Sequence, residues 1–333
     1  HVHQPPAGDP LLNPAWIKQA LALYCPPGQD PKAPGLSPLF ANVRGLPPLL
    51  IQVGSDELLL NDSLRFAEHA KAAGVAVQLE VYPGIWRVLQ GIGAATARLF
   101  HGRGWKVGLL DINHAALASL AAELGGVWHA ELDVADAAAV QAALKDFAAE
   151  HGGQLRLLFN CAGVLRFGHF ESIELAEHAR ILQINVLGLL QMTHAAFPYL
   201  KATANAQVIN MGSASGLYGT PHMASYSASK FAVRGLTEAL DLEWRRHGIR
   251  VGDLMPPFVR TPMVSSQAFE PPALRHLGVN LQAEQIADAV WQQSQGAAVH
   301  RPISGLFKLM YWSAQLSPAW MTRAIMGWLS REK

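Results

Sequence analysis

The chain has 333 residues, half of them apolar and 15% charged, which is enough for one large or two modest domains with a sizeable core. With 26 basic and 25 acidic residues the formal net charge is +1, so nothing indicates a nucleic-acid surface. Two cysteines make no disulfide framework, and the 14 histidines lack metal-ligand spacing, so we expect no metal. No secretion signal or membrane-spanning apolar run is evident, and we expect a cytoplasmic protein.

The N-terminal part of the chain predicts a β-α-β unit. Leu49–Gly54 is an apolar strand, residues 62–73 form an amphipathic helix that Gly74 ends, and residues 75–82 alternate as a second strand. A Pro- and Gly-rich stretch precedes this unit and holds one short helical candidate at residues 14–24.

The amino-acid sequence of residues 46–84 resembles the C-terminal end of an α/β-hydrolase of the hormone-sensitive-lipase-like esterase group. In that group the Asp of Gly-x-Asp-Glu-Leu orients the catalytic histidine, and Asp56 is the matching residue. Arg87 stands at the position of the histidine, and a guanidinium cannot accept a proton. The Gly/Ser turn at residues 212–216 has Ala214 where a nucleophile elbow needs serine. We therefore interpret Asp56 as a helix-start residue and keep carboxylester hydrolysis as an alternative activity.

From Gly91 onward the sequence alternates between strands and helices, which predicts an α/β, doubly wound fold with a parallel sheet. Strands are expected at residues 105–110, 126–132, 155–159, 207–211 and 249–255, and helices at residues 94–102, 115–124, 136–150, 174–200 and 224–243.

Tyr226 and Lys230 are four residues apart in a predicted helix, so their side chains lie on one face. An ammonium beside a phenol favours the phenolate, and we expect Lys230 to lower the pKa of Tyr226 toward working pH. That chemistry suits a general acid/base in the interconversion of a carbonyl and an alcohol. Ser213 follows the strand at residues 207–211, and Asn185 lies inside the long helical run.

These four residues in order, with Phe159-Asn160-Cys-Ala-Gly163, resemble the short-chain dehydrogenase/reductase family from Gly91 to about Met263. The resemblance implies a Rossmann-type fold, a nicotinamide cofactor and a ketone or secondary alcohol as substrate. It gives catalytic roles to four residues: Ser213 polarises the substrate oxygen, Tyr226 transfers the proton, Lys230 also holds the ribose, and Asn185 completes the proton relay at a helix kink.

Gly91-Ile92-Gly93 opens a predicted helix after a strand, where backbone N–H groups can approach a pyrophosphate. Asp111 follows about twenty residues later and can accept both ribose hydroxyls. Its charge would repel a 2′-phosphate, and Gln90 supplies no positive charge, so NAD is favoured over NADP. The alternative for Asp111 is a simple helix N-cap.

The resemblance implies further cofactor contacts. The adenine and its ribose would meet residues after the third and fourth strands, and the nicotinamide would meet a Pro-x-x-Val-x-Thr stretch in which Pro257 replaces the family's glycine. The expected set is Asp133, Val134, Asn160, Ala162, Gly163, Pro256, Val259 and Thr261, together with Tyr226 and Lys230.

The junction between the two resemblances is unusual. The family's loop Thr-Gly-x-x-x-Gly-x-Gly, counted back from Gly93, places Trp86 at the Thr and Arg87 at the first Gly. We interpret the chain as a fusion of a hydrolase fragment (residues 1–89) with a dinucleotide-binding domain (residues 90–333), and a catalytically impaired fusion protein is a further alternative. Residues 77–82 can pair as in the hydrolase or serve as the missing first Rossmann strand, and the sequence leaves both open.

The C-terminal stretch at residues 304–330 carries three tryptophans, three methionines and no acid, with Lys308 and Arg323 interrupting it. It is a candidate substrate lid, subunit contact or interfacial membrane element. We expect a lid or subunit contact, and therefore a homo-oligomer, with weak membrane association as the alternative. With Phe258 and Met263 it suggests a small apolar carbonyl or alcohol substrate.

Overall fold

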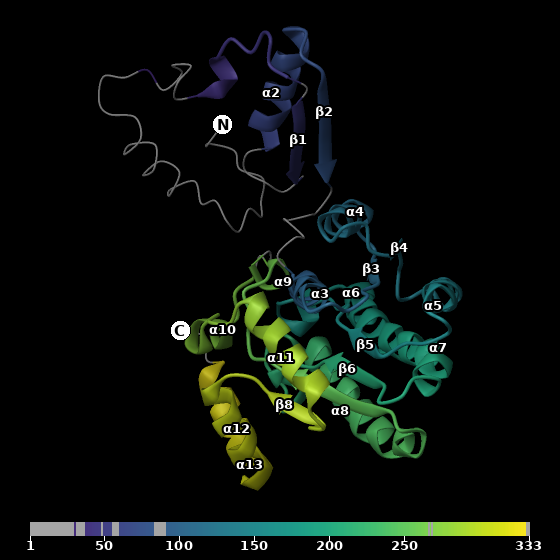
Figure 1. The fold of residues 1–333 in the computed structure, drawn as a ribbon. Coiled ribbons are helices and arrows are strands. Elements are labelled where there is room, and N and C mark those ends of the chain that lie inside the picture. The colour runs from purple at the N-terminus through teal and green to yellow at the C-terminus, as the bar shows by residue number, and fades with distance from the viewer. Residues whose placement is uncertain are drawn as a thin grey trace. The chain divides into compact units, whose positions relative to one another are not determined.

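The computed structural model describes residues 30, 37–47, 49–54, 60–82, 91–265, 267 and 269–330. The chain divides into two compact units, His1–Val88 with Ser265–Ala268 and Leu89–Val264 with Phe269–Lys333 (Figure 1). The helix expected at residues 14–24 lies outside the described residues, as do Asp56, Trp86, Arg87 and Gln90.

The first unit contains the predicted β-α-β arrangement. After a 3-10 turn η1 (Pro38–Phe40) come β1 (Leu49–Gly54), α2 (Leu60–Ala72) and β2 (Val77–Tyr82). The two strands pair in parallel over their whole length, from Leu49 opposite Val77 to Gly54 opposite Tyr82. Thus β2 forms the pairing expected of a hydrolase fragment.

The second unit contains all the remaining elements. Its helices are α3 (Ile92–Gly102), α4 (His114–Glu123), α5 (Ala137–Glu150), α6 (Leu175–Leu182), α7 (Leu189–Lys201), α8 (Ala224–Trp244), α9 (Pro262–Ser265), α10 (Pro272–Leu277), α11 (Ala283–Gln295), α12 (Gly305–Leu316) and α13 (Ala319–Leu329). Its strands are β3 (Leu109–Asp111), β4 (His129–Glu131), β5 (Leu157–Asn160), β6 (Gln207–Met211), β7 (Arg250–Met255) and β8 (His300–Pro302). Short turns η3 (Phe170–Ser172), η4 (Gln183–Gly188), η5 (Ala214–Gly216) and η6 (Arg245–His247) join them.

The strands of the second unit pair in parallel, β5-β6-β7-β8 in one sheet and β3-β4 in another. Alternate residues of a strand face opposite sides of the sheet. Accordingly, Val208 packs with α5 and α7, whereas Ile209 packs with α3 and α11. Helices therefore cover both faces, and the predicted doubly wound, Rossmann-type fold is confirmed (Figure 1).

The described strands do not include the first strand of a Rossmann sheet. In the Rossmann order 3-2-1-4-5-6 the first strand lies between the second and the fourth. Here β3 corresponds to the second strand and β5 to the fourth, and among the described residues of the second unit no strand lies between them. The described residues thus use β2 as the partner of β1 and not as the central Rossmann strand.

Two expected strands are shorter than predicted. Only Leu109–Asp111 and His129–Glu131 pair, instead of residues 105–110 and 126–132. Trp105 lies edge-on to Phe100 with ring centroids 5.2 Å apart, and Trp128 lies edge-on to Phe147, also at 5.2 Å. The carbonyl of Trp128 accepts from the N–H of Leu109 at 3.0 Å, and the pairing begins there.

The helical run expected at residues 174–200 is divided. It consists of α6, the π-helical turn η4 and α7, and the irregular turn holds Asn185. A π-turn inserts one extra residue per turn and often marks a functional position. The sequence reading also missed α11, although a capping box formed by Gln282 and Gln285 opens it and Ile286 and Val290 lie four residues apart on its buried face.

Candidate active site

The site lies where the carboxyl ends of β5, β6 and β7 meet, which is where open parallel sheets bind ligands. Asn160 ends β5, Ser213 follows β6 by two residues, and Pro256 directly follows β7. The backbone N–H of Ala214 donates to the Pro256 carbonyl at 2.9 Å and ties the two loops together. The first turn of α8 lies beside them and brings Tyr226 and Lys230.

Lys230 is buried, and its Nζ donates to the carbonyl oxygen of Met211 at the end of β6 at 2.8 Å. Burial penalises the ammonium and lowers the pKa of Lys230 to about 8, although the negative charge of Asp253 acts in the other direction. The sequence did not predict the Met211 carbonyl as a partner of Lys230, because any residue type can supply a backbone acceptor.

The Oγ of Ser213 accepts from the N–H of Ser215 at 3.2 Å. Burial raises the pKa of Tyr226 to about 12, and the Ser213 side chain opposes this rise only in part. The expectation that Lys230 lowers the pKa of this tyrosine is therefore wrong for this structure. Its Nζ lies 5.5 Å from the centroid of the phenol ring and donates to Met211, so desolvation of the phenolate dominates.

Asn185 is 1% exposed and connects the loop after β5 to α8. Its Oδ1 accepts from the N–H of Val164 at 2.8 Å, and its Nδ2 donates to the Val164 carbonyl and to the Oγ of Ser229, both at 3.0 Å. Ser229 in turn donates to the carbonyl of Tyr226 at 2.6 Å. A Cβ on Gly163 would lie 3.3 Å from Asn185 Oδ1, so glycine leaves room for this link.

Asn160 belongs to a second buried network. Its Nδ2 donates to Thr193 Oγ1 at 3.0 Å and to Asn210 Oδ1 at 2.9 Å, and Asn210 donates to Thr237 Oγ1 at 2.9 Å. These bonds join β5, β6, α7 and α8 below the site. The sequence reading missed Asn210, Thr193 and Thr237, although an amide inside the apolar strand Gln207–Met211 could have indicated a buried polar partner.

The start of α3 forms a possible cradle for a dinucleotide. Gly91 is its N-cap, Ile92 is its first residue, and Gly93 is exposed beside Cys161. A Cβ on Gly93 would find only the Sγ of Cys161 among the described residues, 3.9 Å away. The space in front of this helix N-terminus is thus left open by the described part of the protein, and a pyrophosphate suits such a position.

Asp111 and Asp133 lie exposed at the ends of β3 and β4. The carboxylate of Asp111 accepts from the N–H of Asn113 at 2.9 Å, and that of Asp133 accepts from the N–H of Ala135 at 2.9 Å. Asn113, which accepts from Ala116 at 3.1 Å, is the N-cap of α4. The alternative prediction that Asp111 is the N-cap of this helix is therefore wrong, because Asn113 has that role.

The remaining expected cofactor residues lie in neighbouring loops. Val134 contacts η4 so closely that a Cβ on Gly188 would lie 2.6 Å from its Cγ2. Val259 is buried and pairs with Leu281 in an isolated bridge, and Thr261 Oγ1 donates weakly to the Val259 carbonyl at 3.4 Å. Ala162 is exposed and Gly163 half-buried in the loop after β5.

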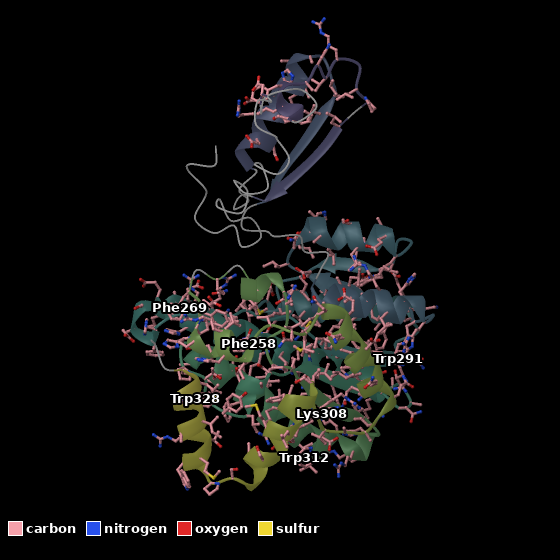
Figure 2. All side chains as sticks on the ribbon, turned by 90° about the vertical axis from the view of Figure 1, so that its left-hand side faces the viewer. Phe258, Phe269, Trp291, Lys308, Trp312 and Trp328 are labelled. Atoms are coloured by element: carbon pink, nitrogen blue, oxygen red, sulfur yellow. The ribbon has the colours of Figure 1, made fainter. Side chains whose placement is uncertain are left out.

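The surroundings of the tyrosine ring are apolar. Tyr226 packs against a cluster from several segments of the second unit, in which Phe167 lies edge-on to Phe258 with ring centroids 6.3 Å apart. Two of its members, Phe258 and Phe269, are labelled in Figure 2. The members are Leu165, Phe167, Met223, Phe258, Val264, Phe269 and Leu274. This environment explains the raised pKa of Tyr226, and it favours apolar substrate groups.

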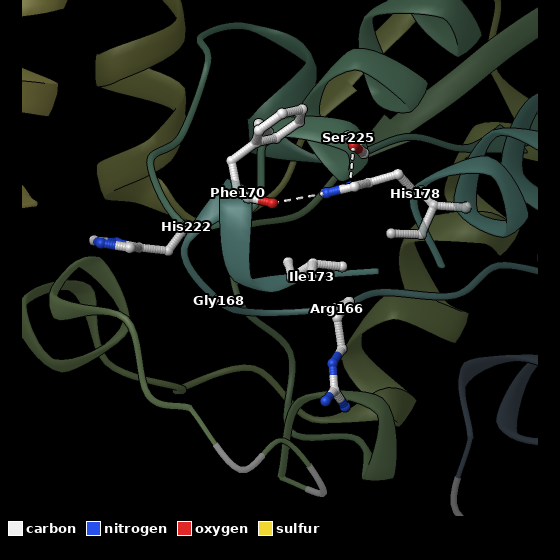
Figure 3. Close-up of a pocket in the computed structure, with 9 residues that line it drawn as sticks. Arg166, Gly168, Phe170, Ile173, His178, His222 and Ser225 are labelled. Atoms are coloured by element: carbon white, nitrogen blue, oxygen red, sulfur yellow. Dashed lines mark hydrogen bonds between the residues drawn. The ribbon is translucent and has the colours of Figure 1, made fainter. Parts of the chain in front are cut away.

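A small cavity of about 20 Å³, room for about one water, lies beside the residue that precedes Tyr226 (Figure 3). His178 spans it: its Nε2 hydrogen-bonds the Phe170 carbonyl at 3.0 Å and its Nδ1 hydrogen-bonds Ser225 Oγ at 2.6 Å. A carbonyl only accepts, so Nε2 carries a proton, and Nδ1 of the neutral ring accepts from Ser225. The pair fixes the start of α8 against α6.

Comparison with known proteins agrees with this arrangement. The family model for short chain dehydrogenases matches residues 88–270, and that for the alpha/beta hydrolase fold matches residues 2–90. The chain belongs to the short-chain dehydrogenase family, and the match of its N-terminal part to the alpha/beta hydrolase fold agrees with the fusion interpretation.

The similar relatives are named as oxidoreductases. Oxidoreductase UcpA of Salmonella typhimurium is 38% identical over 184 residues, 54% of this chain and 69% of UcpA. A 3-alpha-(or 20-beta)-hydroxysteroid dehydrogenase of Mycobacterium tuberculosis is 38% identical over 175 residues, 52% of this chain and 67% of that protein. The crystal structure of a 3-ketoacyl-(acyl-carrier-protein) reductase from Brucella melitensis complexed with NADH shares the fold, with a TM-score of 0.59, 22% identity and coverage of 79% and 98% of the two chains.

Proposed function

We propose that this chain is an NAD-dependent oxidoreductase that interconverts a ketone and a secondary alcohol through Ser213, Tyr226, Lys230 and Asn185. The observation that carries the proposal is the position of Tyr226 at the end of β6: the Nζ of the buried Lys230, one helical turn along α8, lies 5.5 Å from the centroid of its ring and donates to the Met211 carbonyl, and Ser213 follows Met211 by two residues. Membership of an oxidoreductase family and the name of the Brucella structure, which contains NADH, support a nicotinamide cofactor.

The described residues fit a nicotinamide dinucleotide, because the open space before Gly93 and the exposed carboxylate of Asp111 suit its pyrophosphate and ribose. When bound, such a cofactor supplies or accepts a hydride. We assign the phosphates to Gly91, Ile92 and Gly93, with Lys230 on the nicotinamide ribose. The adenine side is assigned to Asp133, Val134, Asn160, Ala162 and Gly163, and the nicotinamide side to Pro256, Val259 and Thr261. Asp111 favours NAD over NADP by repelling a 2′-phosphate.

In the direction of ketone reduction the Ser213 hydroxyl donates to the substrate oxygen, and Tyr226 delivers the proton. A pKa of about 12 keeps Tyr226 protonated at neutral pH, as a proton donor must be. Alcohol oxidation needs the phenolate instead, so its rate should rise with pH over the neutral and alkaline range. Asn185 holds the loop after β5 against α8 through Val164 and Ser229 and so fixes the helix turn that carries the tyrosine.

An apolar ketone suits the cluster around the Tyr226 ring, because Phe167, Met223 and Phe258 offer no polar partner for a charged group. The direct test is titration of the purified chain with NADH, followed by nicotinamide fluorescence, and then reduction of a panel of aliphatic and cyclic ketones. The expected result is saturable binding and turnover that Ser213→Ala lowers strongly. Turnover that survives in Ser213→Ala would contradict the assigned site.

A second candidate is a catalytically impaired fusion protein, and it is favoured by the lack of a strand between β3 and β5 among the described residues. It predicts a cooperatively folded chain that does not bind NADH. The third possibility, carboxylester hydrolysis, is disfavoured by the sequence, because Arg87 stands at the position of the catalytic histidine and a guanidinium cannot accept a proton. Turnover of a p-nitrophenyl ester would support the hydrolase hypothesis.

A further inference from the structure

The two C-terminal helices, α12 and α13, each have a buried face that holds them on the second unit. Their buried residues pack against Ala214, Tyr218 and Met255, close to η5 and β7. The members from the two helices are Phe307, Tyr311, Met326 and Leu329. The Leu329 carbonyl is also hydrogen-bonded to His276 Nδ1 of α10 at 3.0 Å. Both helices are therefore fixed parts of this unit.

Their opposite faces expose large apolar side chains. Leu309 and Trp312 on α12 are 69% and 65% exposed, and Trp320 and Trp328 on α13 are 68% and 62% exposed. We define the C-terminal apolar surface as the six exposed residues Leu309, Trp312, Trp320, Met321, Ile325 and Trp328. Figure 2 shows Trp312 on α12 and Trp328 on α13, in the part of the second unit that these helices form. Single exposed apolar residues are ordinary, but six within 20 residues of sequence mark an interaction surface.

The charges on this surface have one sign. Lys308 and Arg323 are exposed on the same two helices, and the sequence from Ser304 to Ser330 contains no aspartate or glutamate. In a two-fold contact the same patch meets itself, so a second copy would bring these cations together without a carboxylate from either helix. Anionic headgroups would neutralise them instead.

We propose that the C-terminal apolar surface binds the interface of an anionic lipid bilayer. Tryptophan prefers the boundary between headgroups and acyl chains, and Lys or Arg beside it adds attraction to anionic lipid of about 1 kcal/mol per residue. The binding is peripheral, because no helix in the described ranges is both long and apolar enough to cross a membrane. It follows that the protein associates reversibly and more weakly as salt rises.

The test is co-sedimentation of the purified full chain with sucrose-loaded vesicles of phosphatidylcholine alone and of phosphatidylcholine with 30% phosphatidylglycerol. The expected result is binding to the anionic vesicles that is several-fold stronger than to the neutral ones and that falls with added salt. Trp312→Ser combined with Trp328→Ser should reduce the bound fraction at least five-fold, because it removes two large exposed rings, each of which has one ring contact on its own unit, Trp312 with Tyr311 and Trp328 with His276. Lys308→Gln combined with Arg323→Gln should remove the preference for anionic vesicles.

A matched control removes exposed apolar groups elsewhere on the same unit. Leu175→Ser combined with Leu242→Ser changes residues that are 80% and 66% exposed, and it should bind vesicles like the parent. The proposal is overturned if the parent ignores both kinds of vesicle or if the tryptophan variant binds as well as the parent. A lipid-independent dimer that only the tryptophan variant loses would identify a second copy as the occupant instead. None of these readouts needs enzyme activity, so failure of the proposed reaction leaves the test intact.

Discussion

The residues around Tyr226 and the residues assigned to the dinucleotide belong to the same unit, but the strands and hydrogen bonds that hold them in place differ. The catalytic half consists of the ends of β5, β6 and β7 with η4, η5 and α8. Side-chain hydrogen bonds cross it in two buried networks, one through Asn185 and one through Asn160 and Asn210. The sheet below it is continuous from β5 to β8.

The nucleotide half consists of α3, β3, α4 and β4. Its two strands pair over three residues each, and among the described residues no strand joins β3 to β5. The difference follows from the fusion. A site made from side chains four residues apart on a helix depends on local spacing, whereas a dinucleotide cradle depends on a central strand and its glycine turn. A fusion at the first strand therefore preserves the former and endangers the latter.

The largest expected effect tests whether the catalytic half works. Tyr226→Phe removes the proton donor and leaves the ring in its apolar cluster, so turnover should fall by about 10²–10⁴. The dissociation constant for NADH should stay within a few-fold of the parent, as measured by nicotinamide fluorescence. Near-normal turnover in this variant would mean that the reaction does not use this tyrosine.

A pair of glycine substitutions sharpens the comparison, because each half contains one informative glycine. A Cβ on Gly216 would lie 2.8 Å from the Lys230 carbonyl oxygen, so Gly216→Ala forces η5 away from α8. Overpacking of this kind costs about 1–3 kcal/mol of stability, and turnover should fall as Ser213 moves from Tyr226. Gly93→Ala should leave the melting temperature unchanged or higher, since among the described residues its Cβ would meet only Cys161 Sγ, at 3.9 Å.

In Gly93→Ala the affinity for NADH should fall about ten-fold, which is about 1.4 kcal/mol, because the methyl group enters the space assigned to the pyrophosphate. Thermal melting and NADH titration of both variants check the pair. If Gly93→Ala bound NADH like the parent, the cofactor would have to lie elsewhere or not bind in the family's manner.

The neighbourhood of Tyr226, Lys230 and Ser213 could be predicted because it depends on local geometry, whereas their catalytic roles stay a prediction. Tyr226 and Lys230 share a helix face, and Ser213 follows a strand that any parallel sheet would end at the same edge. The pKa of Tyr226 could not be predicted, because the cluster around its ring includes Phe167 and Phe258, which are distant from it in sequence. Burial, and not the neighbouring ammonium, sets the sign of the shift.

Strand pairing was harder to predict than strand position. The apolar strand at residues 77–82 suits either partner, and only the tertiary structure shows the ladder with β1. The short ladder between β3 and β4, three residues in each strand, could not be read from sequence alternation, which extends over longer runs. Asp111 and Asn113 are both residue types that commonly cap a helix N-terminus. In the structure Asn113 is the N-cap of α4, so Asp111 does not have that role.

A smaller effect tests the junction itself. Trp86→Thr combined with Arg87→Gly restores the family's first glycine, which permits a tight turn that a side chain obstructs. NADH affinity should improve several-fold relative to the parent in the same buffer. Arg87 could pair with phosphate oxygens, and equal or tighter binding by the parent would show that this residue is a working phosphate ligand.

The smallest expected effect concerns the buried charges beneath the catalytic half. Asp253 on β7 is buried below Gly212, and both of its carboxylate oxygens lie 3.0 Å from Nδ1 of His300 on β8. The other ring nitrogen of His300 lies 2.9 Å from Glu238, which also pairs with Arg234. Burial works to lower the pKa of His300, but the hydrogen bond and charge of Asp253, aided by Glu238, outweigh it and raise that pKa above 6.5.

Because the folded-state pKa of His300 is raised, its contribution to stability is fully present below about pH 6.5 and is lost as pH rises through the folded value. His300→Gln should therefore destabilise the chain by about 1.5–3 kcal/mol at pH 6, the scale of a hydrogen bond to a charged group, and by less at pH 9. Urea midpoints at the two pH values measure the difference, with the exposed His129→Gln as the control. A gap between parent and His300→Gln that stays constant or widens toward pH 9 would mean that the imidazolium does not support the strands under Lys230. In that case the networks through Asn160 and Asn185 would have to hold the catalytic half without help from these charges.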